Sequence, residues 1–281
     1  MALQSLESNP QLSFTTRMED WTCLGQQKML TLFPLMLFLC GCELHISNPF
    51  ADDTSDAVDA SSHTEETAAF DLKDVPEYNG ISYCDINNSQ PFFTEDEMTV
   101  FSYEYYSPLD ELGRCGECMA CIGKDIMPTE KRESIGMVKP SGWQLARYDG
   151  IIDGKYLFNR CHLIGFQLTG ENANECNLIT GTRYMNEEGM LPFENMTASY
   201  VKKTNNHVMY RVTPIFEGEN LLASGVLMEA ESVEDRGEGL KFNVFCYNVQ
   251  PQIYIDYSTG ENHLTDDESV IHIMCPGPSC Q

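Results

Sequence analysis

The chain has 281 residues, of which 42% are hydrophobic, and its formal net charge is −26. This length and apolar content suffice for a packed core in one large or two small domains, which excludes a chain that is disordered throughout. The acidic balance excludes binding of a polyanion through positive charge spread over the whole chain.

The first predicted feature is an apolar run at residues 29–39, directly after Lys28. It is too short to span a membrane comfortably and is typical of an export signal. The run ends in Leu39-Cys40-Gly41-Cys42, which resembles a bacterial lipobox. Residues 1–42 are therefore predicted to be a signal peptide with lipidation at Cys42, and the alternative is an ordinary signal peptide with an incidental cysteine. The mature chain would lie on the extracellular face of the bacterial cell membrane as a lipoprotein, or be secreted.

Composition changes after the lipobox. Residues 43–77 contain ten acids and one lysine with few large apolar side chains, so they are predicted to form a disordered acidic tether. The folded domain is expected at 78–260, followed by a flexible C-terminal tail at 261–281. In that tail Cys275 and Cys280 flank a Pro-Gly turn and are expected to pair with each other.

Three cysteines share a Cys-x-x-Cys-x-x-Cys spacing, at Cys115, Cys118 and Cys121. On a helix these positions would drift along one side and form a buried thiol stripe. A structural metal site is a second interpretation, although a clear fourth ligand is missing. A disulfide from one of the three to Cys84 or Cys161 is a third.

The central motif is Asn159-Arg160-Cys161-His162, which follows a short strand predicted at 155–158. Arg160 and His162 place a cation and a base two residues apart, just beyond the end of that strand. A base and a cation are the two groups that are required when water attacks a phosphodiester.

A second short element is predicted at 177–180, and a helix follows from Asn186 or Met190 to Lys203. Pro192 suits the first turn of that helix, where a missing N–H does no harm. The near-helical spacing of further apolar residues predicts a core-facing side, formed by Phe193, Met196, Tyr200 and Val201.

The last part of the domain alternates apolar and polar residues in three stretches, 207–216, 220–231 and 240–249. Short turns separate them, so they predict an antiparallel meander. The expected fold class is therefore α+β: a twisted antiparallel β-sheet with helices and an embedded strand–loop–helix finger.

Residues 156–216 resemble the DNA/RNA non-specific endonuclease family, within the ββα-metal or His-Me finger nucleases. The motif at 159–162 carries the resemblance, and Leu109-Asp110 with Gly113-Arg114 resembles the family's N-terminal signature. Asn159 and Cys161 stand where many members have Asp and Gly.

The resemblance implies a role for each matching residue. His162 would be the general base, Asn186 would bind a single Mg²⁺ or Mn²⁺ ion, and Glu194 would orient the waters on that ion. Arg160 would neutralise the phosphate in the transition state. Weaker candidates for contacts with the substrate backbone are Arg114, Asn177 and Arg183.

The predicted function is thus metal-dependent, sequence-non-specific cleavage of DNA, with RNA as a second substrate, read through the phosphate backbone. Charge distribution supports it, because residues 114–211 hold twelve of the 17 Lys and Arg but eleven of the 43 Asp and Glu. Two alternatives remain: a non-catalytic surface lipoprotein that binds extracellular nucleic acid, and a cysteine-based metal or redox protein.

Overall fold

The computed structural model describes residues 70–265 of the chain. The predicted signal peptide with Cys42, most of the acidic tether, and Cys275 with Cys280 lie outside these residues. Within 70–265, no helix combines the length and the apolar character that crossing a membrane would require.

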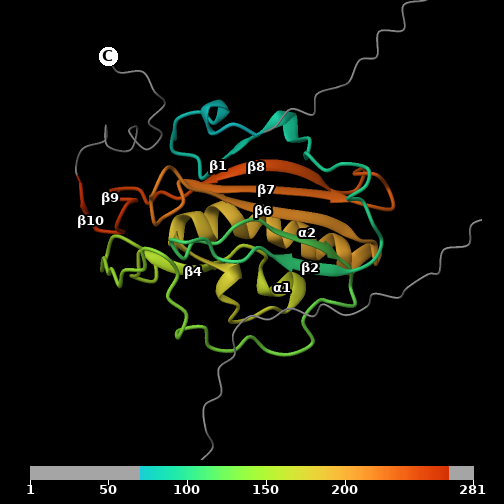
Figure 1. Cartoon of the computed structure of the whole chain (residues 1–281), viewed down its shortest axis with the longest axis horizontal. Coiled ribbons are helices and arrows are strands. Elements are labelled where there is room, and N and C mark those ends of the chain that lie inside the picture. Colours follow the sequence, from blue (N-terminus) through green and yellow to red (C-terminus); the bar gives the residue numbers. More distant parts are fainter. Residues whose placement is uncertain (1–69, 266–281) are drawn as a thin grey trace, which may run out of the picture. The chain divides into compact units, whose positions relative to one another are not determined.

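The fold centres on a six-stranded antiparallel sheet with the strand order β1-β8-β7-β6-β3-β2 (Figure 1). The predicted meander is confirmed, because β6, β7 and β8 pair consecutively through short turns. The strands are β1 (Tyr83–Asp85), β2 (Tyr103–Tyr106), β3 (Cys118–Ile122), β6 (Val208–Ile215), β7 (Gly225–Ser232) and β8 (Lys241–Tyr247). The α+β class is therefore confirmed.

A second, two-stranded sheet carries the central motif. It pairs β4 (Phe158–His162) with β5 (Leu178–Thr182), and His162 lies opposite Leu178. His162 is thus the last residue of a strand, whereas the sequence predicted a strand that ends before it. Between the two strands lie α1 (Phe166–Thr169) and the short 3₁₀ helix η3 (Glu175–Asn177).

The helical part begins directly after β5 with the π-helix η4 (Met185–Met190), which continues into α2 (Leu191–Thr204). Pro192 lies in the first turn of α2, as predicted. Phe193 and Val201 are buried, but the expectation for Met196 is wrong because 44% of its surface is exposed. The buried positions 193, 197 and 201 repeat every four residues, and position 196 falls outside that stripe.

The β4–β5 segment, residues 158–182, is called the finger from here on, and both it and α2 pack on the same face of the large sheet. One apolar cluster joins Leu163 and Ile179 of the finger to Phe193 of α2 and to Tyr210 and Met228 of the sheet. Figure 1 shows α2 running alongside β6, with β4 and α1 nearby. This packing holds the end of β4 and the start of α2 next to each other.

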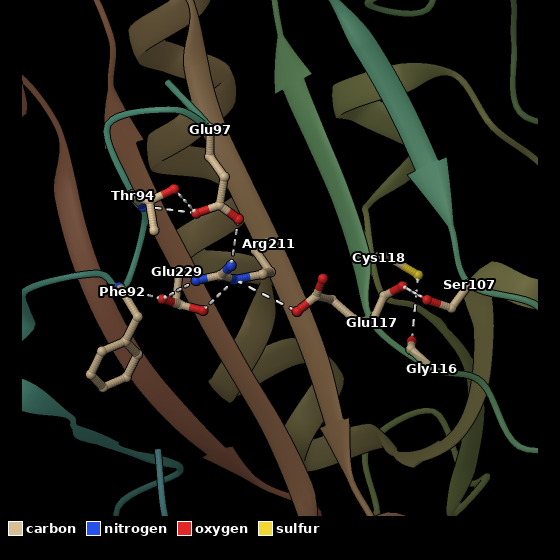
Figure 2. A network of polar contacts seen from close by, with 9 residues as sticks. All are labelled: Phe92, Thr94, Glu97, Ser107, Gly116, Glu117, Cys118, Arg211 and Glu229. Atoms are coloured by element: carbon tan, nitrogen blue, oxygen red, sulfur yellow. Dashed lines mark hydrogen bonds and ion pairs between the residues drawn. The ribbon is translucent and has the colours of Figure 1, made fainter. Parts of the chain in front are cut away.

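The opposite face of the sheet carries an ionic network around the buried Arg211 of β6 (Figure 2). Its guanidinium lies 2.8 Å from Glu229 of β7, 3.2 Å from Glu97 and 3.8 Å from Glu117. The Phe93 ring covers the guanidinium at 4.8 Å. These contacts fix the segment before β2 across the outer face of the sheet.

Both predicted boundaries of the folded domain need correction. Ordered structure begins before residue 78, because the 3₁₀ helix η1 spans Leu72–Asp74 and Phe70 stacks on Phe245 at 6.2 Å. The first residues of the predicted tail form β10 (Asn262–Leu264), which pairs with β9 (Ile253–Ile255). Aromatic stacking at the first boundary and strand pairing at the second thus extend the fold into segments that composition alone indicated to be solvated chain. A further 3₁₀ helix, η2, spans Asn87–Ser89.

Candidate active site

A pocket of about 690 Å³ opens between β4, the start of α1 and the start of α2. It brings together four of the residues predicted from the sequence: Arg160, His162, Asn186 and Glu194. Asn159 and Arg132 also line it, and the segment before β4 supplies apolar side chains. His162 and Asn186 therefore line the same cavity.

His162 is held in one orientation by two polar contacts. His162 is 5% exposed, and its Nε2 atom lies 2.7 Å from the carbonyl oxygen of Asn172. A carbonyl oxygen can only accept, so Nε2 carries the hydrogen and donates it. The lone pair of the neutral ring is consequently on Nδ1, which accepts a hydrogen bond of 3.2 Å from Nη2 of Arg132.

The surroundings of His162 favour its neutral form. Burial lowers the pKa of His162 to about 4, and the positive charge of Arg132 acts in the same direction, while the hydrogen bond to Asn172 opposes both. At neutral pH the imidazole therefore has an unprotonated nitrogen that can accept a proton from water.

Arg132 is a site residue that the sequence did not reveal. It lies in an exposed loop between β3 and β4 and belongs to none of the motifs. The one indication was the local excess of cations between residues 114 and 211. Its guanidinium nevertheless contacts the nitrogen expected to act as base, so it is better placed than Arg160 to meet a phosphate there.

Arg160 lines the pocket, but loop contacts engage much of its guanidinium. Nε donates to the carbonyl of Val138, and Nη2 donates to the carbonyl of Gly136 at 2.9 Å. The guanidinium also stacks on the Trp143 ring at 3.9 Å. Arg160 therefore supplies positive charge to the pocket and fixes the loop that forms one of its walls.

Asn186 and Glu194 come from one continuous helical run. Asn186 is the second residue of η4 and Glu194 lies in the first turn of α2. Eight residues correspond to about two helical turns, so both side chains reach the same side and line the pocket.

The carboxyl group of Glu194 is strongly desolvated. Burial raises the pKa of Glu194 to about 7, and a 3.4 Å hydrogen bond from Gln167 and the charge of Arg132 only partly oppose this. A Cβ atom at Gly165 would approach Oε2 of Glu194 to 2.5 Å. Glycine at position 165 is thus required for the carboxylate to occupy this position.

These residues fit a divalent cation of the Mg²⁺ type. An amide oxygen and a carboxylate are hard oxygen donors, and Mg²⁺ is usually held by few protein ligands while keeping several waters. A nearby cation would also favour the ionised form of the desolvated Glu194. Among the described residues no cluster of three His, Cys, Asp or Glu side chains could hold a metal, so water would complete the coordination.

Three predicted substrate contacts lie elsewhere. The prediction for Asn177 is wrong, because its side chain is fully buried and exchanges hydrogen bonds of 2.8 and 3.0 Å with the backbone of Ile164. Arg114 lies outside the pocket, where it pairs with Asp110 and donates to the backbone of the β6–β7 turn. Arg183 is also outside it and forms a 2.8 Å ion pair with Glu187.

The three cysteines do not form the predicted helical stripe or metal site. Cys118 and Cys121 lie on strand β3, and an odd separation on a strand places side chains on opposite faces. Cys118 packs in the core beneath α2, whereas Cys121 packs on the outer face. Cys84, Cys115, Cys118, Cys121 and Cys161 carry free thiols, so the predicted disulfide from this triplet to Cys84 or Cys161 is absent.

Comparison with known proteins finds both a matching family and similar structures. A model of the family described as DNA/RNA non-specific endonuclease matches residues 94–234. The structure of NucA from Streptococcus agalactiae with magnesium ion bound is similar, with a TM-score of 0.60 and 25% identity over 69% of this chain and 92% of that chain. NucA with no metal bound gives a TM-score of 0.59 and 24% identity over the same shares.

Proposed function

This chain belongs to the DNA/RNA non-specific endonuclease family and is an endonuclease, and we propose that His162 is its general base. The observation that carries the proposal is the orientation of the ring. Its Nε2–H donates to Asn172, so the lone pair lies on Nδ1, in the pocket that Asn186 and Glu194 share, where Arg132 donates to it until substrate enters. In the proposed reaction Nδ1 takes a proton from water, whose oxygen attacks phosphorus as the bond to the leaving oxygen breaks.

Two cations would act on the phosphate. Arg132 lies next to the base and is exposed to solvent, so its guanidinium can move from Nδ1 to a non-bridging phosphate oxygen when substrate enters. Arg160 adds a second positive charge to the pocket while it holds the 136–138 loop. Charge placed in advance where negative charge develops lowers the barrier without further rearrangement.

Mg²⁺, or Mn²⁺ in its place, is the proposed cofactor. Asn186 would bind it through its amide oxygen, and Glu194 would orient its waters or bind directly. When bound, the ion supplies electrostatic stabilisation of the charge that develops on the phosphate and the leaving oxygen. The magnesium ion in the NucA structure supports this assignment.

The proposed substrate is DNA, with RNA as a second substrate, cleaved without regard to sequence. Arginine side chains line the pocket, and they suit phosphate and sugar contacts, which carry no sequence information. We also propose that the chain is exported and anchored to the membrane by lipid at Cys42, since the apolar run at 29–39 and the lipobox support it.

The test is digestion of plasmid DNA and of RNA by the full chain with Mg²⁺, compared with His162→Ala and with added EDTA. We expect nicking and linearisation that EDTA abolishes and that the variant loses by at least ~100-fold. Circular dichroism would establish that the variant is folded. A folded His162→Ala protein that digests plasmid at the normal rate would refute the assignment of the base.

A further inference from the structure

The segment that leads into β4 presents an unusual set of side chains to the pocket. Tyr156 and Phe158 line it together with Asn159, Arg160 and His162, whereas Leu157 and Cys161 are fully buried in the core. The even-numbered positions of this run, which a strand places on one side, thus all border the cavity. Six residues span at most ~20 Å, so Tyr156 lies within a few nucleotides of the proposed base.

A neighbouring segment extends this surface. Arg147 pairs with Tyr156 in an antiparallel bridge, so Leu145 lies opposite Phe158 on the same side. Leu145 is 79% exposed and Tyr156 is 44% exposed, and both line the pocket. Exposed apolar side chains that adjoin one another beside a cavity are typical of ligand-binding grooves.

Phosphate does not explain this surface. A phosphate would bind Arg132 and Arg160, whereas the exposed faces of Leu145 and Tyr156 offer no charge to it. The complementary part of a nucleic acid is the flat face of a nucleobase. In a duplex those faces are stacked inside the helix, but in a single strand they are available to protein side chains.

We propose that Leu145 and Tyr156 form a base-binding wall, and that single-stranded nucleic acid is the preferred substrate of this endonuclease. The inference rests on the proposed function, because it extends the same pocket. It also accounts for binding by a protein with a net charge of −26. Contacts between bases and apolar side chains do not depend on counterion release, whereas phosphate contacts lose affinity with salt.

The first experiment measures kcat and KM of the full chain on single-stranded and duplex oligonucleotides of identical sequence. We expect a higher kcat/KM on the single strand for the wild type. The Leu145→Ser/Tyr156→Ser variant should lower the ratio of single-strand to duplex kcat/KM by roughly 10- to 100-fold, mainly through KM. Tyr156→Phe should retain the wild-type ratio, because the ring remains.

Phe101→Ser is the matched control, since Phe101 is 80% exposed and does not line the pocket. Its ratio should equal that of the wild type. A wild type that prefers duplex, or a double variant with an unchanged ratio, would overturn the base-binding wall.

A second readout separates this proposal from the catalytic one. Fluorescence anisotropy measures binding of a labelled single strand to the His162→Ala protein in EDTA, with and without the two serine substitutions. The wall predicts about 10-fold weaker binding or more after the substitutions. Equal affinities with and without the serine substitutions would refute the base-binding wall even if the enzyme cleaves normally. A loss of affinity would support the wall even if His162 proved not to be the base.

Discussion

The Nδ1 atom of His162 and the Nη2 atom of Arg132 lie 3.2 Å apart, and the arginine donates to the nitrogen proposed as the base. This contact occupies the lone pair that must accept a proton from water. Burial is the main reason that the pKa of His162 is low, and the positive charge of Arg132 lowers it further. Arg132 therefore has two separable effects, one on the pKa of the base and one on the phosphate.

Arg132→Met should reveal both effects. Removing a neighbouring positive charge favours the imidazolium, so the pKa of His162 should rise above its value of about 4. Loss of a phosphate contact should lower kcat/KM by about 100-fold. An NMR titration of the His162 ring measures the first effect and digestion of DNA at saturating Mg²⁺ measures the second.

Lys131→Met is the matched control, because Lys131 is the adjacent exposed cation and does not line the pocket. It should leave both quantities close to the wild-type values. If the His162 titration is the same in all three proteins, Arg132 does not influence the base.

Glu194 should make Mg²⁺ binding depend on pH. Because the pKa of this carboxyl is raised to about 7, a proton competes with the cation below neutral pH. The apparent Mg²⁺ affinity should therefore fall by up to ~10-fold for each pH unit below 7. Glu194→Gln should bind Mg²⁺ more weakly and with little dependence on pH, as measured by titration calorimetry.

Glu188→Gln is a suitable comparison, since Glu188 is exposed and lies on the same helical run outside the pocket. This variant should keep the wild-type pH profile. A Glu194→Gln protein with the wild-type profile would show that another group competes with the cation.

The same carboxyl should destabilise the metal-free fold. A carboxyl whose pKa is raised from 4.5 to about 7 on folding stabilises the native state at low pH, and this contribution disappears as the pH rises from about 4.5 to about 7. At pH 8 in EDTA, Glu194→Gln should therefore have a free energy of unfolding up to ~3 kcal/mol higher than that of the wild type, and it should unfold at a higher temperature. Near pH 4 the two proteins should unfold alike, and a variant less stable at pH 8 would contradict the burial argument.

Gly165→Ala tests how closely the Glu194 carboxylate must be placed. The added Cβ would come within 2.5 Å of Oε2, so the carboxylate must shift. Moving a group that orients a metal typically costs 10- to 100-fold in metal affinity or activity, and we expect a loss of about that size. Gly136→Ala is the control, because its nearest neighbour is 3.7 Å away; equal activities of the two variants would show that the contact is unimportant.

Much of the site could be predicted from the sequence, because its key residues lie in continuous motifs. His162 and Arg160 are two residues apart on one strand, and Asn186 and Glu194 are two turns apart on one helical run. Such local spacing survives any rearrangement of the rest of the fold. The resemblance to a known family then supplied the roles.

The remaining features depend on tertiary packing. Arg132 reaches the base from a loop 30 residues earlier, and no local pattern encodes that contact. Asn177 is polar, which suggested a surface contact. Its side chain instead forms hydrogen bonds with the backbone N–H and carbonyl of Ile164 inside the fold. The spacing of Cys118 and Cys121 suited a helix, but pairing of β3 with β2 and β6 made it a strand.

The ionic network on the outer face of the sheet should matter for stability and not for chemistry. Glu229 is 1% exposed, and Arg211 compensates its charge together with those of Glu97 and Glu117. Arg211→Met would leave three carboxylates facing one another with one of them fully buried (Figure 2). Breaking a buried pair from one side typically costs about 3–5 kcal/mol, and we expect a loss of this order in urea unfolding.

The double variant Arg211→Met/Glu229→Leu should recover part of that loss, because it removes the buried carboxylate that the single variant leaves unpaired. Arg147→Met is the control: its ion pair with Asp149 is about half exposed on both sides and should contribute less than ~1 kcal/mol.

Below the unfolding transition, kcat per folded molecule of Arg211→Met should match the wild type, because Arg211 lies on the face of the sheet away from the finger and α2. A marginal change in stability would mean that the network is hydrated and adds little, whereas a large change in kcat would mean that the two faces of the sheet are coupled.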